Sequence, residues 1–221
     1  MKKLVAITVF LQIVLFSTAQ QTDWGAWVSY VQGVNLPKNF TLHNEIQYRA
    51  WDFRGSLEQL MIRNGVGYNL TPNNDNVLLG YGYILSGIQP TDSTHDKTRS
   101  HEHRLYQQYN HKHKLGRIAL SHRYRFEERF LKDDFKFRIR YFLGIAIPFN
   151  KKTIVKNAVY LSLYNEIFIN TKGTVFDRNR LYGALGYSIT DRVKIEAGAM
   201  AQVYQTDHRP QFQISVFTNW N

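Results

Sequence analysis

The sequence predicts an all-β protein, a single antiparallel up-and-down transmembrane β-barrel of about 10–12 strands. Two observations predict this fold. Apolar and polar residues alternate with a period of two in segments of about ten to fourteen residues, and no segment keeps a helical period. These segments recur to the C-terminus with turn-forming residues between them, and a pattern typical of an export signal precedes them.

The N-terminal segment predicts a cleavable signal peptide. Met1–Lys3 is positively charged, Leu4–Phe16 is almost wholly apolar, and Ser17–Ala19 is small. The apolar run is shorter than the ~20 residues of a membrane-spanning helix, so we interpret it as a signal and not as an anchor. We therefore predict a signal peptide over 1–19 and a barrel domain over 20–221. The absence of cysteine excludes a lipoprotein acyl anchor and a disulfide scaffold.

Eleven segments are predicted as strands. We call each set of every second residue along a segment a parity. In 40–53, one parity carries Ile46 and Tyr48, whereas the other carries Glu45 and Arg49. The fourteen tyrosines and fourteen phenylalanines fall mostly within such segments, where aromatic residues are favoured. In chain order, the predicted strands lie near 24–32, 40–53, 57–70, 76–88, 101–111, 116–127, 135–148, 157–169, 178–189, 193–205 and 210–220.

The last segment, Gln211–Asn221, places Phe212, Ile214, Val216 and Trp220 on one parity. It resembles the C-terminal strand by which the barrel-assembly machinery recognises its clients. It departs from that pattern because Asn221, and not an aromatic residue, ends it. The resemblance implies the assembly machinery as a partner during biogenesis.

The connections between the segments fall into two alternating sets. Compact connections are predicted at 36–39, 71–76, 113–116, 150–152 and 190–192, and longer or more charged ones at 89–100, 128–134, 170–177 and 206–210. Short turns at one end and longer loops at the other are typical of outer-membrane barrels. These barrels usually have an even number of strands, so eleven segments leave two interpretations open. Either the first segment lies inside the barrel, or one segment merges two strands.

Alternation alone does not say which parity faces the lumen. Long strands suit a tilted membrane span, since strands of soluble sheets average five or six residues. The polar parity is rich in arginine where a surface washed by solvent would favour lysine and glutamate. We predict interfacial aromatic residues towards the ends of the apolar stripes, namely Phe40, Tyr83, Tyr124, Phe126, Phe212 and Trp220.

The polar parity then predicts a lumen charge network. It consists of Glu45, Arg49, Arg63, Arg104, Arg123, Arg125, Glu127, Arg138, Arg140, Glu166, Arg180 and Glu196. Two interpretations are open: a charge-paired structural network, or an electropositive constriction that favours anions.

Catalytic and metal-binding patterns are weak. His101 and His103 are separated from His111 and His113 by about eight residues, or ~27 Å along one strand, so the two pairs do not share a metal. Adjacent residues of a strand point to opposite faces, so Ser121 and His122 cannot form a dyad. We predict no catalytic residue, no metal site and no cofactor.

Several short motifs resemble a family of small, uncharacterised outer-membrane β-barrel proteins of Gram-negative bacteria, defined only as a domain of unknown function. The resemblance covers nearly all of the mature chain and implies the fold, but it implies no activity. The motifs are Trp24–Trp27, Glu45–Arg49, Glu102–Gln108, Arg123–Glu127, Arg138–Tyr141, Tyr164–Asn170 and Asn179–Tyr182.

The net charge of +11 falls to about +9 once the signal is removed. Export makes nucleic acid an unsuitable partner, and we expect outer-membrane lipid and lipopolysaccharide instead; the sequence indicates no soluble partner. We predict a protein of the cell outer membrane, a narrow porin-like pore with an arginine-rich lumen or an interaction scaffold. An outer-membrane enzyme that modifies or hydrolyses lipid, and a soluble periplasmic lipid-binding barrel, remain alternatives.

Overall fold

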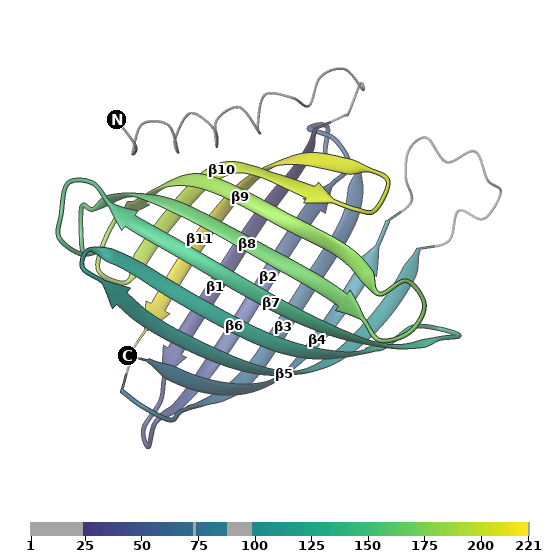
Figure 1. Cartoon of the computed structure of the whole chain (residues 1–221), viewed down its shortest axis with the longest axis horizontal. Helices are drawn as coiled ribbons and strands as arrows, with labels where there is room; N and C mark the ends of the chain where they lie inside the picture. The colour runs from purple at the N-terminus through teal and green to yellow at the C-terminus, as the bar shows by residue number, and fades with distance from the viewer. Residues whose placement is uncertain (1–23, 73, 88–98, 221) are drawn as a thin grey trace, which may run out of the picture.

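The computed structural model describes residues 24–72, 74–87 and 99–220, which form a closed barrel of eleven strands (Figure 1). The predicted signal peptide lies outside the described residues. No helix in the described part of the chain is long and apolar enough to cross a membrane. The strands are β1 (Gly25–Asn35), β2 (Phe40–Ala50), β3 (Leu57–Asn69), β4 (Asp75–Ser86), β5 (Ser100–Leu115), β6 (Ile118–Phe130), β7 (Phe135–Pro148), β8 (Val159–Asn170), β9 (Phe176–Ser188), β10 (Val193–Val203) and β11 (His208–Trp220).

The barrel closes through a parallel pair. Every strand is antiparallel to its neighbour in sequence, but β1 and β11 run in the same direction, with Gly25 opposite Gln211 and Val34 opposite Trp220. The eleven strands fall within the predicted 10–12, whereas the parallel β1–β11 pair departs from the predicted antiparallel arrangement. The first segment is a strand of the wall, and no segment merges two strands. An odd number of alternating strands forces the first and the last to point the same way.

The two ends of the barrel carry different connections. We name them the Gly25 end, where β1 begins, and the Trp220 end, where β11 ends. The connections predicted to be compact all lie at the Trp220 end, and those predicted to be longer lie at the Gly25 end. The prediction of a compact turn at 150–152 was wrong, because that connection spans 149–158. The side chain of Asn150 stabilises this connection, because it accepts a hydrogen bond from the backbone N–H of Val159 and donates one to the backbone carbonyl of Asn157.

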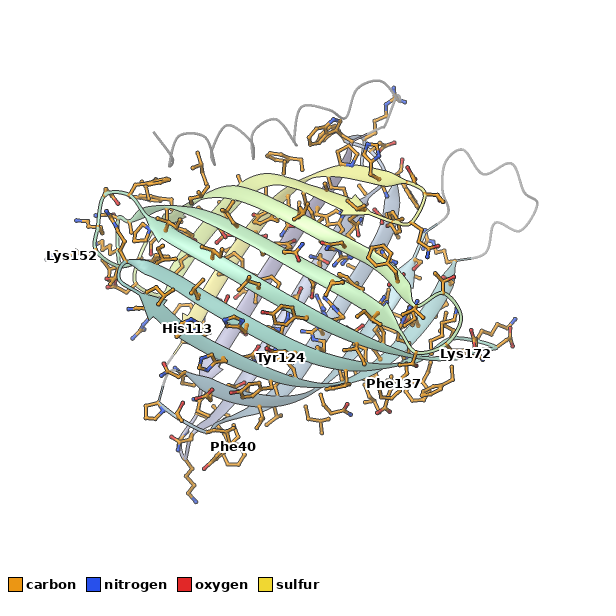
Figure 2. The ribbon with its side chains drawn as sticks, in the orientation of Figure 1. Phe40, His113, Tyr124, Phe137, Lys152 and Lys172 are labelled. Carbon is orange, nitrogen blue, oxygen red and sulfur yellow. The ribbon has the colours of Figure 1, made fainter. Side chains whose placement is uncertain are left out.

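The wall is apolar outside and charged inside. Outward Ile46, Leu79 and Leu185 are 50%, 61% and 62% exposed, whereas inward Arg125 and Glu127 are 1% exposed. The side chains radiate from the wall in Figure 2, with Tyr124 on the wall between Lys152 and Lys172 at opposite ends. This burial pattern is the reverse of that of a soluble barrel, which encloses its apolar face.

Glycines on the inward parity allow tyrosine rings to lie flat against the wall. Gly80 is paired with Tyr106, and a Cβ built on Gly80 would lie 2.2 Å from that ring. Gly186 and Tyr160 repeat the arrangement on β9 and β8 with the same 2.2 Å approach. Small residues opposite large ones fill this part of the interior, as is common in small barrels.

Candidate functional site

The predicted lumen network lies on the inward face of the wall. All of its members are buried except Arg123, which is half-buried. Ten of the network residues also take part in ion pairs within the described part of the chain, which leaves Arg49 and Glu196 with other partners.

Glu127 is the centre of the first cluster. Its carboxylate accepts hydrogen bonds from Arg138 Nη2 at 2.6 Å and from Arg140 Nη1 at 2.5 Å. Arg125 Nη1 lies 3.4 Å from the same carboxylate. All four residues are 4% exposed or less, so one buried carboxylate is shared by three guanidinium groups.

Glu166 is the centre of the second cluster. Its Oε1 accepts from Arg140 Nη2 at 2.6 Å and from Arg123 Nη2 at 2.8 Å, and its Oε2 lies 3.7 Å from Arg180 Nη1. Arg140 therefore bridges the two carboxylates, a geometry that the five donors of a guanidinium group allow. Further along the wall, Arg63 donates to Glu45.

The predicted network left out four charged residues, Glu102, Arg129, Asp177 and Arg178, of which Arg178 Nε lies 3.3 Å from the Asp177 carboxylate. Glu102 accepts from Arg104 Nε at 2.7 Å and from Arg129 Nε at 2.5 Å, and Asp177 accepts from Arg138 Nη1 at 2.9 Å. Arg129 and Asp177 were missed because they fall in segments predicted as loops. Glu102 shares its parity with Arg104, and that signal was available in the sequence.

Arginine side chains also stack on aromatic rings in the lumen. The Arg49 guanidinium carbon lies 3.8 Å from the centroid of Trp27, and that of Arg180 lies 4.9 Å from it. Arg140 and Arg180 lie 4.4 and 4.5 Å from the centroid of Phe168. Cation–π contacts of this kind add to the stabilisation of buried guanidinium groups.

The half of the lumen nearest the Trp220 end is open. A vestibule of about 840 Å³ is lined there by both polar and apolar side chains, among them Lys112, Ser121, Lys194, Glu196, Phe142 and Phe217. Glu196 accepts a hydrogen bond from the Tyr160 hydroxyl at 3.1 Å. In the half nearest the Gly25 end, the described residues enclose a cavity of about 50 Å³. Four arginines line both spaces and form the layer between them: Arg49, Arg63, Arg140 and Arg180.

Comparison with known proteins gives a family. The model of the family described as "Protein of unknown function (DUF2490)" matches residues 24–213. The chain belongs to this family. The DUF2490 match runs from the residue before β1 into β11, so it includes every strand that contributes to the arginine layer. No curated protein and no solved structure matches the chain.

The outer wall of this DUF2490 barrel carries the predicted interfacial aromatics. Phe40 and Trp220 lie at the Trp220 end, and Phe212 lies towards the other end of β11. Tyr83 is half-buried and bonds His101. The prediction that the aromatics lie near strand ends does not fit Tyr124 and Phe126, which lie in the middle of β6.

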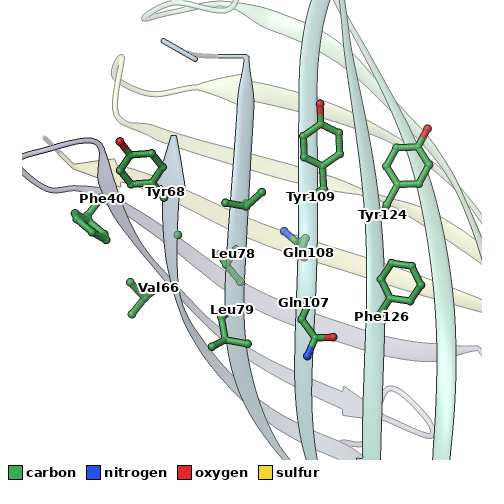
Figure 3. A pocket seen from close by; sticks show the side chains of 12 residues that line it. Phe40, Val66, Tyr68, Leu78, Leu79, Gln107, Gln108, Tyr109, Tyr124 and Phe126 are labelled. Atoms are coloured by element: carbon green, nitrogen blue, oxygen red, sulfur yellow. The ribbon is translucent and has the colours of Figure 1, made fainter. Parts of the chain in front are cut away.

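A groove of about 480 Å³ runs across the outer faces of β2–β6 (Figure 3). Its lining residues include Val66, Tyr68, Leu79, Tyr109 and Phe126, and none of them is charged. It therefore forms part of the apolar outer surface and is a weaker candidate for polar recognition than the lumen.

Histidines lie at both ends of β5 on the outer wall. His103 bonds Tyr81 at 2.6 Å near the Gly25 end, and His111 bonds Asp75 at 2.8 Å near the other. No group of three or more histidine, aspartate or glutamate side chains among the described residues is arranged to hold a metal ion. Ser121 lines the vestibule, whereas His122 lies on the outer parity and bonds the Tyr141 hydroxyl. The two cannot act together as a catalytic pair.

Proposed function

We propose that this DUF2490 protein is an integral barrel of the outer membrane of a Gram-negative bacterium and acts as a narrow, anion-selective conduit. The observation that carries the proposal is the reversed burial pattern, with charges inside and apolar side chains outside. Lipid acyl chains suit such a wall, whereas exposing it to water would cost a free energy of about 25 cal/mol per Å² of apolar surface. A soluble lipid-binding barrel requires the opposite pattern.

The proposed location defines the partners of the outer wall. Outer-membrane lipid and lipopolysaccharide would contact its apolar surface, and the barrel-assembly machinery would insert it. The signal-like N-terminal sequence and the apolar parity of β11 support this route.

Anion selectivity is supported by the arginine layer between the vestibule and the small cavity. Arg49, Arg63, Arg140 and Arg180 line both spaces, so an ion that crosses the lumen must pass between them. Rings of arginine favour anions because they compensate the lost hydration of a negative ion. The tight packing of this layer predicts a small conductance.

Substitution on the outer wall tests whether the barrel spans a membrane. Ile46 lies near the middle of β2, and Leu115, which is 62% exposed, ends β5. In lipid vesicles, Ile46→Arg should lower the free energy of unfolding by about 2–4 kcal/mol, and Leu115→Arg by about 0–1 kcal/mol. On a wall exposed to water, both changes would be close to neutral. Urea titration of the refolded protein measures the difference, and two equally small effects would contradict a membrane span.

Conductance tests the conduit itself. Purified protein in a planar bilayer with a KCl gradient should show a reversal potential closer to the equilibrium potential of chloride than to that of potassium. Arg49→Gln should reduce the anion preference, whereas Arg192→Gln, which removes the same charge from a turn at the Trp220 end, should leave it unchanged. If the inserted barrel carries no current above that of the bare bilayer, the conduit is wrong even where the membrane span holds.

A further inference from the structure

The small cavity near the Gly25 end is walled by arginine. Among the described residues, no carboxylate lines it, and its lining residues other than arginine are Gln59, Met61 and Phe168. The lining residues come from seven strands, so the fold brings together residues that are far apart in the sequence. The eight arginines are Arg49, Arg63, Arg104, Arg129, Arg138, Arg140, Arg178 and Arg180.

The carboxylates that pair with these arginines do not line the cavity and are shared. Glu102 serves both Arg104 and Arg129, and Asp177 serves both Arg138 and Arg178. Glu127 and Glu166 are each shared among three arginines, and Glu45 pairs with Arg63. The cations in contact with the cavity therefore outnumber the anions that compensate them.

Arg49 is the clearest member of this excess. It is 5% exposed, and its hydrogen bonds go to the amide oxygens of Gln47 and Gln59 at 2.6–2.9 Å. Its guanidinium packs on Trp27. Neutral acceptors and an aromatic face supply less stabilisation than a carboxylate, so a buried positive charge remains in need of an anion.

Arg63 supplies a second observation. Its Nε is buried and has no hydrogen-bond partner among the described residues, although the rest of its guanidinium bonds Glu45. Arg63 is 6% exposed and lines the cavity. A buried N–H donor without an acceptor is costly, and an acceptor placed in the cavity would relieve the cost.

The size of the cavity limits what can occupy it. Its volume of about 50 Å³ is several times the 10–15 Å³ that holds one water molecule. Such a space suits a small polyatomic anion and is too small for a sugar, a nucleotide or a peptide. Guanidinium groups match the oxygens of phosphate and carboxylate, because their paired N–H donors form two parallel hydrogen bonds.

We propose that this arginine-walled cavity is a binding site for a small oxyanion of the inorganic phosphate class, which the surplus guanidinium groups hold. This proposal rests on the proposed function in one respect, because the anion would reach the cavity through the conduit. Binding itself can be measured without transport.

The test uses the purified, folded mature protein in detergent micelles, titrated with inorganic phosphate by calorimetry. Ionic strength is held constant with chloride, so that general charge attraction is the same throughout. We expect saturable binding of about one phosphate per barrel. Arg49→Gln should weaken it at least tenfold, because Arg49 can be removed without leaving a carboxylate unpaired. Arg192→Gln, the variant with the same change in charge, should bind like the wild type.

Arg49→Lys keeps the charge but loses the paired N–H donors of the guanidinium group. It replaces Arg49→Gln in the binding test if the glutamine variant does not fold. It should also weaken phosphate binding. Absence of saturable binding by the wild-type protein, or equal weakening by Arg49→Gln and Arg192→Gln, would overturn the site. The two proposals can fail separately. Phosphate binding without conductance refutes the conduit alone, and conductance without phosphate binding refutes the site alone.

Discussion

The two halves of the lumen share one inward-facing parity of the same strands, yet they differ in packing. Near the Gly25 end, arginines and shared carboxylates leave about 50 Å³, whereas near the Trp220 end a vestibule of about 840 Å³ remains. The closed half is filled by long charged side chains held in ion pairs. The open half carries shorter side chains, among them Ser121, Gly144 and Ser162. Alternation decides which face looks inward, and side-chain length and charge pairing decide whether the lumen is filled.

The largest effect expected from this comparison comes from removing a carboxylate in each half. Glu127→Ala should lower the free energy of unfolding by about 3–5 kcal/mol, because it leaves Arg125, Arg138 and Arg140 buried without their shared anion. Glu196→Ala should cost about 1 kcal/mol, since it removes hydrogen bonds to tyrosine hydroxyls at the edge of the vestibule. Urea titration in lipid vesicles measures both values. Similar losses would show that the halves do not differ in this way.

A smaller effect is expected from adding one methyl group to each half. In Gly80→Ala the new Cβ would meet the ring of Tyr106, which is fully buried and covered by Arg125. We expect a loss of about 1–3 kcal/mol. In Gly144→Ala the new Cβ would meet the Ser121 hydroxyl at 2.5 Å and the Phe142 ring at 2.8 Å, and both side chains line the vestibule, where there is room for them to turn. The expected loss is below about 1 kcal/mol. A larger loss for Gly144→Ala would contradict the assignment of the open half.

The smallest effect lies outside the wall, at the Gly25 end. A hydrogen bond from Lys136 lowers the pKa of Asp134, and Lys172 adds to the effect. Because the pKa is lower in the folded state, this contact stabilises the fold above the ordinary pKa of aspartate and is lost as the pH falls through the lowered value. Lys136→Met should return the pKa of Asp134 towards its ordinary value, as followed by NMR titration in micelles. An unchanged titration midpoint would show that the contact is not populated in solution.

Much of the wall could be predicted from the sequence. The predicted strand over 135–148 coincides with β7, and every predicted strand overlaps an observed one. The inward parity was also predictable, because arginine recurs at every second position, as at Arg138 and Arg140. These features depend on the local period of two, which a single sequence displays.

The pairing inside the lumen could not be predicted in the same way. Arg138 reaches Asp177 on β9, and Arg123 reaches Glu166 on β8. Which inward residues meet depends on the tilt and stagger of the strands, and alternation is the same for every stagger. The parallel closure was missed for a different reason. The eleven predicted segments already imply it, but the expectation of an even number of strands favoured other interpretations of the first segment.

The pairing of β1 with β11 determines how the two ends of the polypeptide could be joined. In a barrel with an even number of strands, the start of the first strand and the end of the last strand lie at the same rim. A linker of a few residues would then make the chain circular. Here Gly25 and Trp220 occupy opposite rims, because the two strands are parallel. A cyclised variant would need a linker that crosses the whole height of the wall, roughly 30 Å for a strand the length of β1. Epitope tags fused ahead of β1 and behind β11 would likewise lie at opposite rims, and therefore on different sides of the bilayer under the proposed membrane span.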